Sequence, residues 1–278
     1  MLRVIFITLF PAILFAGNIE LSIKDHNGNS SYIVESPSQN LKAKLIFPFE
    51  FNALDVVYNH KFTFFDIKVN SSFVLNDKTT TGKDYDWHND NLTVFSTSDN
   101  KIDKYTDFGL EISKDIWNNL RALAGFNYKT FDFHWSNTYQ EDFINDSTSN
   151  IQGETLKYQQ TFYQYNLGLN YKNEIYKDIL IELEPALIYA FIESKDTHVL
   201  RSFYTLQKSQ AFGYTFQCNA NYKLTQNSKI KLSLNYEMLK DKNVDMDYYN
   251  LLGSKYLTYP SSYRYENRTI GIGYIFSF

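Results

Sequence analysis

The chain ends in Thr-Ile-Gly-Ile-Gly-Tyr-Ile-Phe-Ser-Phe, residues 269–278, and this stretch decides the fold. Successive side chains of an extended strand point to opposite faces. One face carries only apolar side chains: Ile270, Ile272, Tyr274, Phe276 and Phe278. The other carries small or polar ones, Thr269, Gly271, Gly273 and Ser277, with Ile275 as the exception. Such a strand, ending on an aromatic residue, is typical of the closing strand of a bacterial outer-membrane β-barrel, whose apolar face meets lipid and whose polar face lines the lumen.

The N-terminal residues predict secretion. Arg3 is the only charged side chain in the first 18 residues, an apolar run follows over 4–15, and Ala16-Gly17 ends it. This is the pattern of a signal peptide cleaved after Ala16, and the run is too short to cross a bilayer as a helix. We therefore expect a signal peptide over 1–16 and one barrel domain over 17–278. An uncleaved interfacial helix is the alternative.

Composition agrees with an outer-membrane protein. The net charge is −4, from 27 Lys and Arg against 31 Asp and Glu, so no basic surplus predicts a nucleic-acid partner. Aromatic residues make up 18% of the chain, and barrels place such residues in girdles at the two membrane interfaces. Cys218 is the only cysteine, which excludes a disulfide framework and a cysteine-based metal site.

Apolar and polar residues alternate with a period of two through much of the chain, which predicts strands with one polar face. The segments concerned are 41–51, 65–73, 107–113, 162–171, 216–224 and 230–238. A soluble β-sandwich would alternate in the same way. The signal peptide, the aromatic content and the terminal Phe278 favour the membrane.

The connections predict the number of strands. Short turns are expected at 59–60, 113–118, 171–177 and 225–228, and long polar segments at 25–40, 75–104, 136–157 and 240–263, with a further connection at 195–201. Four short turns on one side and five connections on the other give ten antiparallel strands in an up-and-down barrel. Both ends of the barrel domain would then lie on the periplasmic side.

Two short motifs carry candidate chemistry. Asp84 and Asp86 lie two residues apart, as do Asp196 and His198, so each pair shares a face of a strand. The alternation of the neighbouring strands points both pairs into the lumen. A carboxylate beside an imidazole orients it as a base, and a second pair of carboxylates could hold a water or share a proton. The alternative is that all four are ordinary solvated loop residues.

At these motifs the chain resembles the omptin family of outer-membrane endopeptidases, which are ten-stranded barrels with an extracellular Asp-Asp and Asp-His groove. The similarity is carried by residues 84–87, 124–126, 193–198 and 219–229. It implies that Asp196 and His198 activate a water for attack on a peptide carbonyl and that Asp84 and Asp86 complete the site. Neither a cofactor nor a metal is implied. Expected partners are surface peptides or proteins and outer-membrane lipid, including lipopolysaccharide that activity can require.

The chain departs from the family pattern at the substrate-binding positions. Omptins that cut at basic residues use acidic groups, whereas the corresponding positions here are Asn29, or a neighbour, and Ser194. A preference for Arg or Lys is therefore not implied. The family's lipopolysaccharide motif would fall at Phe126, Tyr128, Thr130 and Thr161, where charged partners are missing.

Three other hypotheses remain open. A catalytically silent adhesin would bind through 75–104 and 136–157. A small pore would be lined by lumen charges, although in a narrow ten-stranded interior these are expected to pair with one another. The charges concerned are Lys68, Glu111, Arg121, Glu182, Glu184 and Lys231. A metal site at His88 and Asp90 has only a weak ligand spacing to support it.

Overall fold

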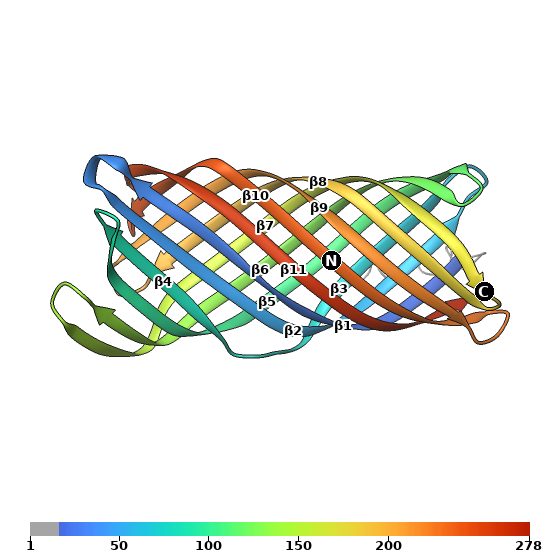
Figure 1. The fold of residues 1–278 in the computed structure, drawn as a ribbon, viewed down its shortest axis with the longest axis horizontal. Helices are drawn as coiled ribbons and strands as arrows, with labels where there is room; N and C mark the ends of the chain where they lie inside the picture. Colours follow the sequence, from blue (N-terminus) through green and yellow to red (C-terminus); the bar gives the residue numbers. More distant parts are fainter. Residues whose placement is uncertain (1–16) are drawn as a thin grey trace.

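The computed structural model describes residues 17–278, so the predicted signal peptide lies outside the described residues. These residues form one antiparallel sheet (Figure 1). No helix in this part of the chain is long and apolar enough to cross a membrane. The elements are β1 (Gly17–Ser36), η1 (Pro37–Gln39), β2 (Leu41–Lys61), β3 (Asp66–Asp77), β4 (Thr80–His88), β5 (Asn91–Trp117), β6 (Leu120–Asp142), β7 (Ser147–Tyr176), β8 (Ile179–His198), β9 (Phe203–Lys223), β10 (Ser228–Asn250) and β11 (Lys255–Ser277).

The sheet closes into a barrel because β1 pairs with both β2 and β11. It contains 11 strands, but β3 and β4 lie end to end in one position. β3 pairs with 51–61 of β2, β4 pairs with 41–46 of β2, and both pair with β5. The ring therefore has ten strand positions, as the sequence predicts, and every pairing is antiparallel.

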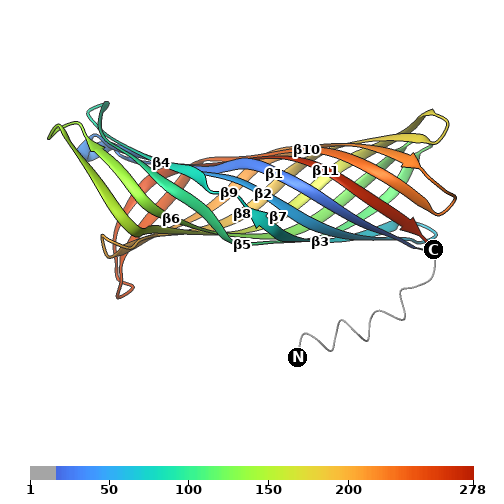
Figure 2. The same ribbon diagram turned by 90° about the horizontal axis from the view of Figure 1, so that it is seen from below.

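The barrel is long, and its two ends differ (Figures 1 and 2). The terminal end holds the start of β1, the end of β11 and the turns β2–β3, β5–β6, β7–β8 and β9–β10. The hairpin end holds the turns β1–β2, β4–β5, β6–β7, β8–β9 and β10–β11. The described ends of the chain thus share one end of the barrel, which agrees with the predicted topology.

An apolar outer band surrounds the terminal half of the barrel. On β8 Leu187 and Phe191 are exposed, and Glu193 and Lys195 follow them on the outer face. On the other strands the band includes Leu21, Ile23, Phe108, Leu110, Leu167, Leu169, Phe212, Phe216, Leu232, Leu234, Ile270 and Ile272. A band of exposed apolar side chains is what a barrel presents to lipid. The hairpin half, beyond this band, projects out of the membrane.

The long polar connections predicted at the hairpin end are wrong, because most of these residues belong to strands. Segments 25–40, 75–104, 136–157 and 240–263 mainly extend the strands, and the turns between them are short. Outside the membrane the outer face meets water and becomes polar, while the inner face becomes apolar. The apolar face of 41–51 accordingly points inward and not at lipid: Phe47, Phe49 and Phe51 are almost completely buried.

Aromatic side chains fill the barrel at mid-height. Phe47 stacks on Tyr158 with ring centroids 4.0 Å apart, and Phe131 stacks on Phe133 at 5.5 Å. The same buried cluster includes Tyr32, Phe49, Phe51, Tyr105, Trp135, Phe162, Tyr263 and Tyr265. We call this set the aromatic plug. It separates the interior of the hairpin end from the lumen of the terminal end.

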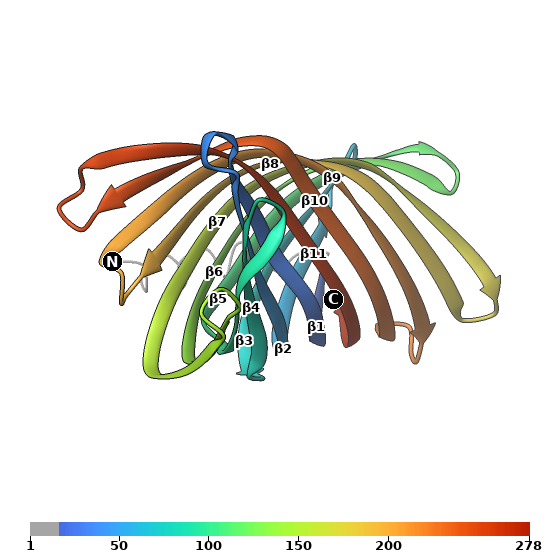
Figure 3. The ribbon, with the colours of Figure 1, turned by 60° about the vertical axis from the view of Figure 1, so that its left-hand side comes forward.

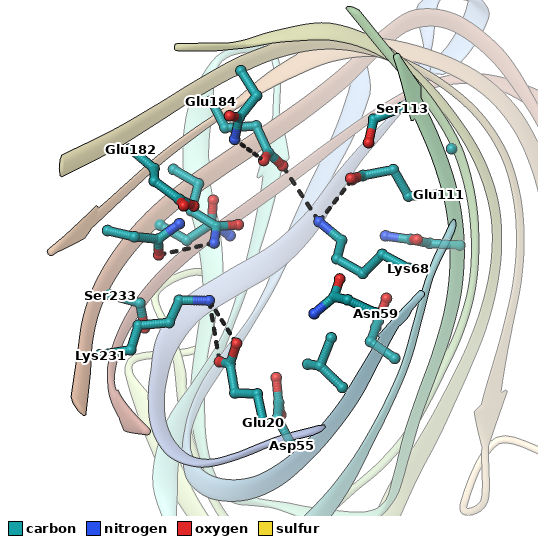
Figure 4. A pocket seen from close by; sticks show the side chains of 18 of the residues that line it. Glu20, Asp55, Asn59, Lys68, Glu111, Ser113, Glu182, Glu184, Lys231 and Ser233 are labelled. Atoms are coloured by element: carbon teal, nitrogen blue, oxygen red, sulfur yellow. Dashed lines mark hydrogen bonds and ion pairs between the residues drawn. The ribbon is translucent and has the colours of Figure 1, made fainter. Parts of the chain in front are cut away.

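Below the aromatic plug, the lumen is a polar cavity of about 620 Å³ (Figure 4). Lys68 lies between Glu111 and Glu184, with Nζ 2.8 Å and 3.7 Å from their carboxylate oxygens. Lys231 pairs with Glu20 at 2.9 Å. Arg121 pairs with Asp66 and Asp115, and Lys172 pairs with Glu182. The predicted mutual pairing is confirmed for Lys68, Glu111 and Glu184, whereas Arg121, Glu182 and Lys231 pair with other charged residues.

Candidate functional site

β4 brings two carboxylates into the interior of the hairpin end. Asp84 lies opposite Leu45 on β2, and Asp86 lies opposite Ala43. Directly paired residues share a face of the sheet, and Leu45 is only 4% exposed, so both aspartates point inward. Between the start of β3 and Asp84 the chain contains a bulge opposite Asn52 and the break between β3 and β4. Even-numbered residues nevertheless face inward before the bulge and again on β4, as predicted.

β8 brings in the Asp–His pair from the other side of the ring. Asp196 is 1% exposed, and Oδ2 of this residue lies 3.5 Å from His198 Nε2. The Tyr32 hydroxyl reaches across from β1 and donates a hydrogen bond to the same Oδ2. The imidazole also stacks on Phe203, with ring centroids 4.3 Å apart. His198 is therefore held between a carboxylate and an aromatic ring.

Burial sets the charge of the two aspartates on β4, which lie beyond the membrane band. Burial raises the pKa of Asp84 to about 7, and the neighbouring Asp86 carboxylate raises it further, against the opposing effect of His198 and Arg201. The pKa of Asp86 is also raised, again mainly by burial. Two close, desolvated carboxylates resist ionising together. The pair therefore holds a proton more readily than two isolated carboxyl groups would.

Burial and the charge of Asp196 shift the pKa of His198 in opposite directions. Burial disfavours its charged form, but the Asp196 carboxylate outweighs burial and raises the pKa of His198 above its usual value. The charge of Asp84 acts in the same direction. Since Asp84 in turn responds to His198 and Asp196, the four predicted residues lie within one electrostatic site. Both motifs thus face the interior at the hairpin end of the barrel, Asp84 and Asp86 from β4 and Asp196 and His198 from β8.

A family profile supports the resemblance given by the motifs. It is described as the omptin family, and it matches residues 49–278. The chain belongs to the omptin family. An omptin-family barrel with an apolar outer band is a protein of the bacterial outer membrane.

The fold of this omptin is similar to that of solved barrels. The outer membrane protease OmpT from Escherichia coli matches with a TM-score of 0.86 at 16% identity, over 95% of this chain and 97% of that chain. The translocator domain of the autotransporter NalP from Neisseria meningitidis matches with a TM-score of 0.45 at 9% identity, over 100% of this chain and 95% of that chain. Comparison with curated proteins gives no significant match.

The two predicted substrate-binding positions of this omptin differ in placement. Ser194 faces inward two residues below Asp196, is 4% exposed, and accepts a hydrogen bond of 3.2 Å from Gln160 Nε2. Asn29 lies between the inward-facing Gly28 and the fully buried Ser30, so it points to the outer face. The structure brings Ser194 to the base of the site and does not bring Asn29 there.

Tyr32, Arg201 and Phe203 belong to the site but were not found from the sequence. Tyr32 lies 164 residues from Asp196, and only closure of the barrel joins them. Arg201 follows His198 in the β8–β9 turn, and its charge acts on both aspartates of β4. Phe203 begins β9 opposite His198. Of these three residues only Phe203 had a local signal in the sequence, as the first aromatic residue after the Asp-x-His motif.

His88 and Asp90, considered above as an alternative metal site, do not form part of a ligand cluster. Within residues 17–278 no group of three or more His, Cys, Asp or Glu side chains could hold a metal ion. His88 is exposed at the end of β4, where Nε2 contacts the Asn89 side chain at 3.4 Å, and Asp90 lies in the next turn with φ of 61°.

Proposed function

We propose that this omptin is an outer-membrane endopeptidase that hydrolyses peptides or surface proteins on the extracellular side. Family membership and fold support an outer-membrane protease. One observation supports the assignment of residues: Asp84 and Asp86 of β4 and Asp196 and His198 of β8 face the interior at the same end of the barrel, where their charges act on one another. Such a site offers a base, a carboxylate that orients it and a proton-sharing pair of acids.

The geometry gives each group a role in this mechanism. Asp196 Oδ2 faces His198 Nε2, so the Nε2 proton points toward the carboxylate and Nδ1 is free to act as the base. Nδ1 takes a proton from a water as its oxygen attacks the peptide carbonyl carbon. The resulting imidazolium is stabilised by Asp196 and then gives the proton to the departing amine. Tyr32 holds Asp196 in place through its hydrogen bond.

Asp84 and Asp86 act on the other side of the substrate. The ionised member of this pair accepts a hydrogen bond from the attacking water. The protonated member donates one to the carbonyl oxygen as negative charge develops there, which is the role of an oxyanion hole. The raised pKa of Asp84 keeps a proton available for this donation near neutral pH.

The experiment is a mass-spectrometric digest of a mixed peptide library by the refolded barrel, with and without lipopolysaccharide. Wild type is compared with His198→Ala, Asp84→Asn and His88→Ala, the last being an exposed histidine at the same end of the barrel. We expect the first two substitutions to slow cleavage by at least about 10²-fold and the third to leave it unchanged.

Two results would contradict the proposal. Cleavage that survives both His198→Ala and Asp84→Asn would remove these residues from the mechanism. If folded wild type cleaves nothing with or without lipopolysaccharide, the barrel is a binding protein on an omptin scaffold. Dependence of cleavage on the added lipid would support lipopolysaccharide as a partner.

A further inference from the structure

The wall of the mouth next to His198 is uncharged and partly aromatic. Backbone pairing places Asp196 of β8, Thr205 of β9, Tyr248 of β10 and Leu257 of β11 in one row on the inner face. The row below contains Ser194, Gln207, Met246 and Tyr259. After Asp196 neither row contains a charged side chain. Asp247, next to Tyr248, points outward and pairs with Lys255 at 2.6 Å.

The aromatic rings of this wall form a continuous series that starts at the candidate base. His198 stacks on Phe203, Phe203 contacts Tyr248 at 5.8 Å, and Tyr248 contacts Tyr259 at 5.6 Å and Tyr256 at 6.4 Å. Phe203, Tyr248 and Tyr259 are half-buried, and Tyr256 is 55% exposed. The rings therefore keep accessible surface, unlike those of the aromatic plug.

Two of the acidic residues lie on a different wall, whereas Asp196 borders this one and its charge acts on Tyr248. Asp84 and Asp86 belong to β4, and the hairpins β4–β5 and β10–β11 lie on different sides of the mouth (Figures 2 and 3). A peptide that reaches His198 therefore has carboxylates on one side and the uncharged aromatic wall on the other. A side chain next to the scissile bond that turns toward β9–β11 meets aromatic rings, and these two rows of β9–β11 offer it no charged side chain of their own.

We propose that the rings of Phe203, Tyr248 and Tyr259 form a substrate subsite for an apolar or aromatic side chain flanking the scissile bond. This inference rests on the proposed function. An apolar side chain would bury ring surface that stays exposed in the free protein, and an aromatic one would also stack. A Lys or Arg side chain would lose hydration there, and no residue of these rows of β9–β11 would form an ion pair with it.

The test is a set of peptides that differ only at the residues flanking one scissile bond, with Phe, Leu, Ala, Lys or Asp at those places. We expect kcat/KM with Phe or Leu to exceed that with Lys or Asp by about tenfold or more. Asp is included because Arg201 lies near the mouth and could attract it.

Substitutions at Tyr248 test the effect of the aromatic wall on specificity without changing the proposed catalytic residues. Tyr248→Ala is expected to remove most of the preference for Phe over Ala, while Tyr248→Phe keeps it, since the ring and not the hydroxyl makes the subsite. Tyr249→Ala is the matched control, because Tyr249 lies next in sequence on the outer face and stacks on Tyr204.

The outcomes distinguish this inference from the proposed function. A higher kcat/KM with Lys or Asp than with Phe, or an equal loss for every peptide in Tyr248→Ala, would overturn the subsite while leaving the protease. Failure of wild type to cleave any peptide would overturn the proposed function, and the subsite with it.

Discussion

At the residue scale, Asp84 couples the chemistry of the site to the stability of the barrel. Burial raises its pKa from 3.8 to about 7 on folding. A carboxyl whose pKa rises on folding favours the folded state at low pH, where it is protonated in both the folded and the unfolded chain. Its contribution is lost as the pH rises from the unfolded pKa through the folded one, because the unfolded chain then ionises freely and the folded chain resists.

We therefore predict that Asp84→Asn stabilises the barrel at alkaline pH. The neutral amide cannot ionise, so unfolding in detergent should require about 1–3 kcal/mol more at pH 9 than for wild type, and the difference should vanish near pH 4. Asp90→Asn, in the exposed β4–β5 turn, is the control and should show no such dependence. A difference that is constant across pH would argue against a buried, proton-holding Asp84.

Tyr32 is predicted to be a positioning residue. In Tyr32→Phe the donor to Asp196 is lost, so the carboxylate is less well fixed, and kcat should fall about tenfold with little change in KM. The unshared negative charge would also hold the proton on His198 more strongly, so the acid limb of the pH–rate profile should move to higher pH.

The control for Tyr32→Phe is Tyr265→Phe, because Tyr265 is likewise buried in the aromatic plug but lies beside Lys129, whose Nζ is 5.3 Å from its ring centroid. A purely structural effect of Tyr32→Phe would lower activity without moving the profile. That result would rule out the positioning role.

At the element scale, the position of β4 depends on one glycine. A Cβ at Gly82 would overlap the indole ring of Trp135. That ring cannot easily move, because it is 3% exposed and its Nε1 donates a 2.9 Å hydrogen bond to Asn100. Gly82 lies two residues before Asp84 on the same face. The absence of a side chain at Gly82 therefore sets how closely Asp84, the first carboxylate of the candidate site, approaches the interior.

We predict that Gly82→Ala displaces β4 and lowers kcat by about tenfold or more, since small misplacements of catalytic groups are costly. The barrel should still fold, which can be checked by comparing the gel migration of unheated and heated samples. Gly125→Ala is the matched control: the nearest atom to a Cβ there is a backbone oxygen at 3.3 Å. Equal activity of both variants would show that β4 has room to adjust.

The same elements show what the sequence could and could not predict. A period of two correctly placed Asp196 and His198 in the lumen, because the outer face of β8 stays apolar up to Phe191. The same pattern failed in the hairpin half of the barrel. There the outer face meets water instead of lipid and the apolar residues lie on the inner face, so polar strand residues were predicted as loops. Contacts across the ring, such as Tyr32 with Asp196, depend on closure of the barrel and leave no local pattern.

At the scale of the whole molecule, the barrel is two compartments separated by the aromatic plug. The lumen at the terminal end is filled with paired charges, and the mouth at the hairpin end holds the candidate site. In the plug, Phe49 and Phe131 are 2% and 0% exposed, with ring centroids 5.3 Å apart. The pore hypothesis needs an open path between these compartments, and the buried rings of the plug lie between them.

We therefore predict that the wild-type barrel shows no steady ion conductance in planar bilayers, and that Phe49→Ala with Phe131→Ala creates one by opening the plug to the charged lumen. Each truncation should also cost about 3–5 kcal/mol of stability, so single variants serve if the double variant does not fold. Phe212→Ala is the control, because Phe212 is 68% exposed on the outer face and its loss leaves the plug intact. Steady conductance by wild type, equal to that of the double variant, would mean that the plug does not close the barrel. The mouth would then be the entrance of a channel.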